Sequence, residues 1–124
     1  MDNVNLKYLQ LSATQHTSEA TLQKQIATFL DWKKHVWMHS PNEGKRSPRT
    51  GAHLKAQGMK GGFPDICIFD LKLVIELKTK YNKPTPLQAE WLERMRGLGW
   101  SAWWVNSFEE FEALYEDTIN AITK

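Results

Sequence analysis

Residues 61–80 read GGFPDICIFDLKLVIELKTK, and this stretch indicates the fold. Two short apolar runs rich in β-branched residues, 65–69 and 73–78, flank the tripeptide Asp-Leu-Lys at 70–72. Runs of this kind joined by a few turn residues are typical of paired antiparallel strands. Because few polar side chains interrupt them, we expect the hairpin to lie in the middle of a sheet.

Charged residues break the apolar pattern of this hairpin. Glu76 and Lys78 interrupt the second run, and Asp65 opens the first directly after Pro64. Since side chains alternate along a strand, Glu76 and Lys78 project to one face and Leu77 to the other. Burying a charge is unfavourable unless it is paired or binds a metal. One interpretation is therefore a salt bridge at the solvated end of the strand.

A metal site is the second interpretation. If the two runs pair as antiparallel neighbours, the carboxylates of Asp65 and Glu76 come close at one end. Two converging carboxylates repel each other unless a cation lies between them, and oxygen ligands suit Mg²⁺ or Mn²⁺. Lys78 beside such an ion would orient or activate a water and offset negative charge developing on a phosphate.

A helix over residues 18–34 precedes the hairpin, with Ser18 as its N-cap. Its apolar face consists of Leu22, Ile26, Phe29 and Leu30. Glu19 falls on this inward face, which makes it a further candidate for the acidic cluster. The alternative is an ordinary first-turn acid that complements the helix dipole.

A second helix follows the hairpin. Thr85 as N-cap, Pro86 at the first helical position and Gln88 two residues later form a capping box, and Gly97 and Gly99 end the helix. Its expected buried stripe is Leu87, Trp91, Leu92, Met95 and Leu98. The capping box explains Gln88 locally, but at the first turn Gln88 would also face a ligand.

Further strands over 36–38 and 101–106 and a last helix complete the domain. Ser107 and Glu110 form a second capping box. The apolar face of the last helix is Phe108, Phe111, Leu114, Tyr115 and Ile119. The order α-β-β-β-α-β-α predicts an α/β (α+β) fold with a central mixed sheet flanked by helices.

Residues 42–62 read as a basic loop with at most one helical turn near 53–57. No acid occurs between Glu43 and Asp65. Residues 1–60 carry a net charge of +5 and residues 101–124 one of −4, which favours an anionic partner on one side. Two ordinary solvated faces are the alternative. The candidate DNA-binding residues are Asn42, Lys45, Arg46, Arg49, Lys55, Lys60 and, beyond the hairpin, Lys80.

Length and composition exclude several classes of protein. A chain of 124 residues suggests one domain at 18–124, preceded by an arm at 1–17. No apolar run is long enough to span a membrane, and the N-terminus does not resemble a signal segment. A single cysteine, Cys67, excludes an internal disulfide framework and argues against a structural zinc site. We therefore expect a cytoplasmic protein with no membrane partner.

Six tryptophans are many for one small core. Trp103 and Trp104 are adjacent on a strand and are expected to face opposite sides. Aromatic residues are enriched at interfaces. We expect one of Trp32, Trp37, Trp100 and Trp104 to lie in a subunit interface; the alternative is that all six pack inside the domain.

The sequence resembles the PD-(D/E)XK nucleases through Pro64-Asp65, ten further residues and then Glu76-Leu77-Lys78. The other similarities point to the VRR-NUC subfamily and cover residues 18–105, about seven-tenths of the chain. They comprise Glu19, Pro41-Asn42-Glu43, Lys55-x-x-Gly58, Gly62-Phe63-Pro64-Asp65 and Gln88.

The resemblance implies a metal-dependent phosphodiesterase acting on DNA, with Mg²⁺ or Mn²⁺. Asp65, Glu76 and the main-chain carbonyl of Leu77 would hold the metal, with Glu19 as a further ligand, directly or through water. Lys78 would position the attacking water, and Gln88 would contact the phosphate or support Lys78. Stand-alone members resemble homodimeric Holliday-junction resolvases, which suggests DNA repair and a phage or bacterial source.

Specificity is expected to come from DNA shape. The chain has no helix with an obvious base-reading face, so phosphate position and branch geometry are favoured over sequence-specific cutting. A two-fold dimer would suit symmetric cutting of a branched duplex. The alternatives are a non-cleaving nucleic-acid-binding accessory protein and a nuclease acting on linear or flapped DNA.

Overall fold

The computed structural model describes residues 18–40, 48–79 and 81–123. Its elements are α2 (Glu19–Trp32), β1 (Trp37–His39), α3 (Pro48–Ala56), β2 (Ile66–Ile68), β3 (Leu73–Leu77), α4 (Pro86–Gly97), β4 (Ser101–Val105) and α5 (Phe108–Thr123). The predicted order is confirmed, with α3 added between the first two strands. Across these ranges, every helix is too short or too polar to cross a bilayer.

The four strands form one mixed sheet in the order β1-β2-β3-β4. β2 pairs antiparallel with both β1 and β3, and β4 runs parallel to β3. The hairpin therefore occupies the middle of the sheet, as predicted. Ile66 is the partner of Ile75, so the next positions outward, Asp65 and Glu76, are neighbours at one end of the hairpin.

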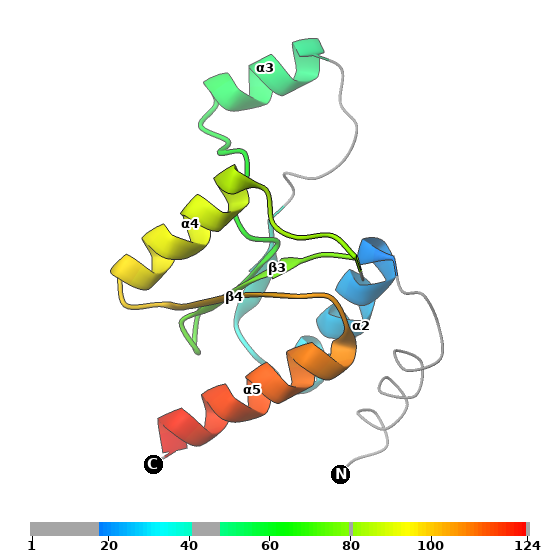
Figure 1. Ribbon diagram of the computed structural model, residues 1–124, viewed down its shortest axis with the longest axis vertical. Coiled ribbons are helices and arrows are strands. Elements are labelled where there is room, and N and C mark those ends of the chain that lie inside the picture. The colour runs from blue at the N-terminus through cyan, green and yellow to red at the C-terminus, as the bar shows by residue number, and fades with distance from the viewer. Residues whose placement is uncertain (1–17, 41–47, 80, 124) are drawn as a thin grey trace.

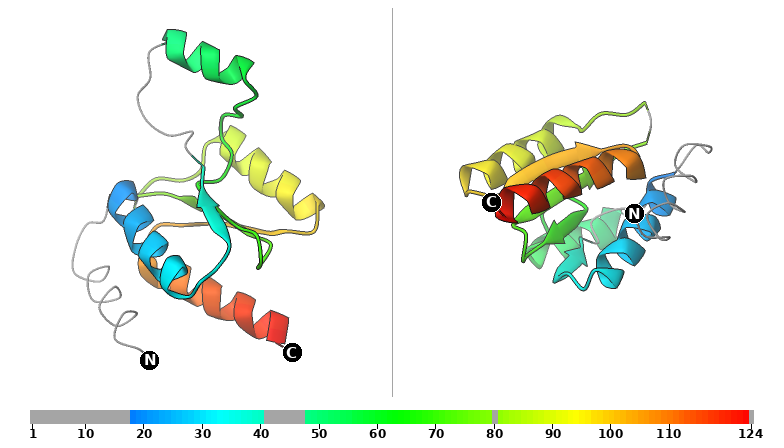
Figure 2. Two further views of the ribbon diagram at one scale, coloured as in Figure 1. Left: turned by 180° about the vertical axis from the view of Figure 1, so that it is seen from behind. Right: turned by 90° about the horizontal axis from the view of Figure 1, so that it is seen from below.

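Helices cover both faces of the sheet. α2 and α5 lie against one face and α4 against the other (Figures 1 and 2). On the α2 and α5 side, the ring of Phe29 makes edge-to-face contacts with Phe108, Phe111 and Tyr115. The α4 side is smaller and holds Cys67, Val74, Leu92, Met95 and Ala102. Burial on both faces explains why β2 and β3 read as nearly unbroken apolar runs.

The predicted caps of α2 and α4 are confirmed. The Ser18 side chain accepts a hydrogen bond from the Thr21 amide, and Thr85 and Gln88 form a full capping box. The box predicted for α5 is half right. The Glu110 amide donates to Ser107 Oγ, but the Glu110 carboxylate accepts from the amide of Asn106 instead of that of Ser107.

Several predicted boundaries need correction. α2 ends at Trp32 instead of residue 34, where Lys34 has a φ of 63°, and β1 spans 37–39 instead of 36–38. In α4 the predicted stripe is too wide, because Leu87 and Leu98 are 50% and 72% exposed. These two leucines flank the segment that the sheet covers, and only the turns between them are buried.

The basic segment also differs from its prediction. Instead of a loop with one turn near 53–57, it contains the helix α3, which extends from one end of the domain, apart from the layers around the sheet (Figures 1 and 2). Pro48 suits the first turn of a helix, whereas Gly51 weakens the helical signal. Leu54 is half-buried, and α3 lacks the apolar stripe that identifies a helix from sequence.

Candidate active site

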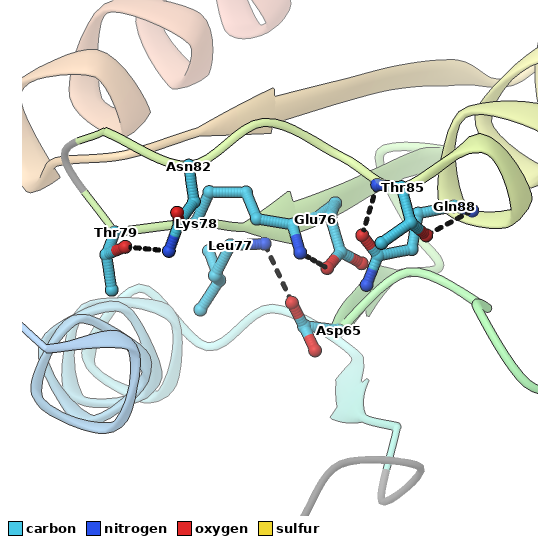
Figure 3. A network of polar contacts seen from close by, with 8 residues as sticks. All are labelled: Asp65, Glu76, Leu77, Lys78, Thr79, Asn82, Thr85 and Gln88. Carbon is cyan, nitrogen blue, oxygen red and sulfur yellow. Dashed lines mark hydrogen bonds and ion pairs between the residues drawn. The ribbon is translucent and has the colours of Figure 1, made fainter.

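Asp65 lies at the open end of the hairpin and is held by several hydrogen bonds. Its side chain is buried, and Oδ2 accepts a hydrogen bond from the Leu77 amide at 2.7 Å (Figure 3). Its main-chain oxygen accepts from the Ser40 amide at 2.7 Å and lies 3.0 Å from His39 Nδ1. One contact to the carboxylate and two to the main-chain oxygen therefore fix the position of Asp65.

Glu76 and Lys78 form an ion pair on the same face of β3. Lys78 Nζ lies 3.7 Å from Glu76 Oε2, and the two residues are 9% and 1% exposed (Figure 3). The side chain of Leu77 packs into the core on the opposite face, as the alternation predicts. The salt bridge is thus present, but its prediction at a solvated strand end is wrong, because α4 covers this face.

A cavity of about 330 Å³ connects Asp65 to the first helix. Its lining includes Glu19 from α2, His39 from β1, Asp65 and Leu77, together with Ala20, Gln23 and Lys24. Glu19 therefore borders the same cavity as Asp65 and is not only a solvent-exposed acid at the helix N-terminus. Acidic residues from α2 and from the position before β2 line this cavity.

Gln88 serves the helix cap. Its side-chain Oε1 accepts from the main-chain amide of Thr85 at 2.9 Å, and its main-chain amide donates to Thr85 Oγ1 at 3.3 Å (Figure 3). The loop between β3 and α4 is closed further by a hydrogen bond from Asn82 Nδ2 to Thr79 Oγ1. Gln88 is half-buried, and its side-chain oxygen Oε1 takes part in the cap. Of its side-chain polar atoms, Nε2 is the one that the cap does not use.

The donor set fits a hard divalent ion. Asp65, Glu76, Glu19 and the Leu77 carbonyl offer oxygen atoms only, the ligands that Mg²⁺ and Mn²⁺ prefer. Over the described ranges, no three Asp, Glu, His or Cys side chains gather into a ready-made ligand cluster. Asp65 is next to both other acids: Glu19 lines the same cavity, and Glu76 lies on the neighbouring strand.

The candidate DNA-binding residues divide into two groups. Arg49 and Lys55 on α3 and Lys60 after it are exposed. Asn42, Lys45, Arg46 and Lys80 lie outside the described residues, as do Pro41 and Glu43. The three candidate residues that the structure describes are therefore on α3 or shortly after it, in the segment that extends away from the sheet.

His39 was not among the residues predicted for the site, although it contacts Asp65 and lines its cavity. A histidine at a strand end has no sequence signal of its own. The signal that exists is its position two residues before Pro41-Asn42-Glu43 in the part of the chain that resembles the nuclease pattern.

A second polar network lies at the opposite end of the sheet. His35 Nδ1 contacts Asp70 Oδ2 and His35 Nε2 contacts the Tyr115 hydroxyl, both at 2.8 Å. Desolvation acts to raise the pKa of Asp70, but hydrogen bonds from His35 and the Val36 amide outweigh it and lower that pKa. Burial raises the pKa of Tyr115. This network ties α5 to the hairpin turn.

The comparisons with known proteins concern the fold. No protein-family model and no curated protein matches the chain. A solved structure described as "VRR_NUC domain protein" is similar, with a TM-score of 0.66 and 23% sequence identity over 86% of this chain and 91% of that one. The mixed sheet and its flanking helices are thus shared over nearly the whole length of both chains. We conclude that this chain has the fold of a VRR-NUC domain protein.

Proposed function

We propose that this protein is a metal-dependent DNA endonuclease that hydrolyses phosphodiester bonds. The observation that carries the proposal is the buried Asp65 carboxylate, anchored to the Leu77 amide beside the buried pair of Glu76 and Lys78. Burying these charges at the end of a strand destabilises the fold, and a catalytic role in phosphodiester hydrolysis would explain why they are there. The similarity to a VRR-NUC domain fold supports this choice.

Each residue has a role that its position permits. Asp65, Glu76 and the Leu77 carbonyl would hold Mg²⁺ or Mn²⁺, and Glu19 would contribute directly or through water. When bound, the ion supplies Lewis-acid stabilisation of charge on the phosphate. Lys78 would orient the attacking water, because its ammonium is held within 3.7 Å of Glu76 and away from bulk solvent. The amide nitrogen of Gln88 would contact the phosphate.

The preferred substrate in this proposal is branched DNA such as a four-way junction. The exposed Arg49, Lys55 and Lys60 present positive charge on and beside α3, which suits phosphate contacts rather than base reading. Because phosphate contacts release counterions, DNA binding should weaken steeply with salt.

A homodimer is the second part of the proposal. In the sheet that the described residues form, β4 is an edge strand, and a groove of about 730 Å³ runs between it and α5. Trp103, Trp104 and Ile122 line the groove and are 48%, 38% and 56% exposed. A second copy that covered this face would bury aromatic surface and pair an open strand edge.

The tryptophans bear on this dimer. Trp32, Trp103 and Trp104 are substantially exposed, so the alternative that all six tryptophans pack inside the domain is wrong. Sedimentation of the Trp104→Lys variant should show a monomer, whereas Trp32→Lys, on α2, should sediment as the wild type does. A dimer that survives Trp104→Lys would place the interface elsewhere.

A substrate panel tests the activity. Purified protein is incubated with Mg²⁺ or Mn²⁺ and four-way junctions, flaps, splayed arms or linear duplex of matched sequence. We expect cleavage of junctions first and complete loss of cleavage in Glu76→Gln and Lys78→Met. Lys34→Met, in the turn after α2, and Glu109→Gln on α5 change exposed residues and are the matched controls. Full activity of either site variant would refute the proposed site.

The non-cleaving alternative rests on the basic surface of α3. If the protein binds branched DNA but cuts no substrate even with Mn²⁺, an accessory binding role replaces the nuclease role. Cleavage confined to flaps or linear duplex would instead keep the chemistry and change the substrate.

A further inference from the structure

The ring of His39 is held in one tautomer. Nδ1 lies 3.0 Å from the main-chain oxygen of Asp65. A carbonyl oxygen only accepts hydrogen bonds, so Nδ1 carries the proton of the neutral ring. The lone pair of the neutral imidazole is therefore on Nε2.

The same contact fixes where the ring lies. The Asp65 carbonyl also accepts from the Ser40 amide, so both residues at the end of β1 are tied to the residue before β2. The exposed imidazole lines the cavity that Glu19 and Asp65 share. A histidine that binds a metal in a protein usually donates its other ring N–H to a carboxylate or a backbone carbonyl. The arrangement of His39 matches that pattern, with the carbonyl supplied by the proposed ligand residue Asp65.

We propose that His39 Nε2 is a nitrogen ligand of the divalent ion held by Asp65. This inference rests on the proposed function, because it concerns the same ion. The chemistry predicts a preference: imidazole is a better ligand for transition ions than for Mg²⁺, so His39 would favour Mn²⁺ over Mg²⁺.

The other histidines of the described ranges do not fit this role. Both ring nitrogens of His35 are engaged, with Asp70 and Tyr115. His53 is exposed on α3 and does not line the cavity. His39 is therefore the histidine of these ranges that combines a fixed tautomer with a place beside Asp65.

Electron paramagnetic resonance of the full-length protein with Mn²⁺ tests the inference. Electron spin echo envelope modulation detects a ¹⁴N nucleus that is directly coordinated to Mn²⁺. We expect this modulation in the wild type and in His53→Asn, and its loss in His39→Asn, whose side-chain Nδ2 takes the place of the ring Nδ1 and can still donate to the Asp65 carbonyl. Mn²⁺ affinity should fall about tenfold or more in His39→Asn, and Mg²⁺ affinity, measured by competition, should fall less.

Labelling removes the dependence on a variant that folds. In wild-type protein grown with ¹⁵N-histidine, the ¹⁴N modulation should be replaced by a ¹⁵N signal. Bound Mn²⁺ without a nitrogen signal, or a histidine signal that persists in His39→Asn, would overturn the inference.

A third variant separates this failure from failure of the proposed function. If Asp65→Asn abolishes Mn²⁺ binding but the wild type shows no coordinated nitrogen, only the role of His39 is wrong. If Mn²⁺ binds equally well to Asp65→Asn, the ion lies elsewhere and the proposed active site fails with it.

Discussion

Asp65 has two separable roles, one in charge and one in holding the strand end, and two substitutions distinguish them. Asp65→Ala removes both the carboxylate and the acceptor that the Leu77 amide uses at 2.7 Å. Asp65→Asn removes the charge but keeps a carbonyl oxygen of the same reach. Both variants should lose metal-dependent cleavage, whereas only Asp65→Ala should lose substantial stability.

The magnitude follows from burial. Asp65 is 2% exposed, so in Asp65→Ala the Leu77 amide would stay buried without its acceptor. An unsatisfied buried donor costs about 1–3 kcal/mol. For a domain of this size, 1 kcal/mol corresponds to roughly 4 °C in the unfolding midpoint. We expect a decrease of about 8 °C for Asp65→Ala, taking about 2 kcal/mol as the cost.

In Asp65→Asn the loss of stability should be small. The substitution also removes one of two neighbouring carboxylates, and without metal their repulsion opposes folding. The midpoint of this variant in EDTA should therefore equal or exceed that of the wild type.

Urea and thermal unfolding in EDTA, followed by circular dichroism, measure both variants without metal binding. Hydrogen exchange at the Leu77 amide gives a local readout, since protection should be lost in Asp65→Ala and kept in Asp65→Asn. Glu109→Ala on the exposed face of α5 is the control. Equal midpoints for the two Asp65 variants, or equal protection of Leu77, would refute the anchoring argument.

Three further predictions concern other parts of the molecule. Gly58 has a φ of +102° with open space around it, so Gly58→Ala should lower the free energy of unfolding by about 1–2 kcal/mol through backbone strain alone. Gly62 has a φ of +83°, and the new Cβ of Gly62→Ala would also lie 2.7 Å from the Leu87 side chain, so this variant should lose more stability. Denaturant midpoints of the two variants compare these losses. Because the folded pKa of Asp70 lies below its usual value of 3.8, this carboxylate stabilises the fold above about pH 4, and that contribution is lost as pH falls through the folded pKa; Asp70→Asn should flatten the acid side of the stability profile. The double variant Arg49→Ala, Lys55→Ala should unfold like the wild type but bind DNA with a salt slope lower by about 0.9 for each phosphate that the variant no longer neutralises, and an unchanged slope would remove α3 from the DNA interface.

Local patterns predicted the elements that have strong local signals. The hairpin was predicted because two β-branched runs flank a short polar turn, and α4 because Thr85, Pro86 and Gln88 each prefer the first turn of a helix. α3 was underestimated for the same reason. It has almost no buried face, so the apolar spacing that identifies a helix is missing, and Gly51 lowers its propensity further.

The candidate site could be predicted only in part. Asp65, Glu76 and Lys78 lie on paired strands, so alternation and register were enough to bring them together. Glu19 required the packing of α2 against the sheet, and its spacing from Leu22 and Ile26 indicated the correct face. His39 was missed because its role depends on how β1 pairs with β2, a contact between residues 26 positions apart.

The sequence by itself determined the order of the strands, the caps of α2 and α4, and the alternation that places Glu76 and Lys78 on one face of β3. These features depend on interactions between residues a few positions apart, which composition and spacing encode directly. Only the tertiary structure decided that the Glu76–Lys78 pair is buried, that Glu19 and His39 share a cavity with Asp65, and that Trp103 and Trp104 border an open groove. Burial and long-range contact depend on which surfaces the folded chain brings together, and the spacing of residues within one element does not specify that.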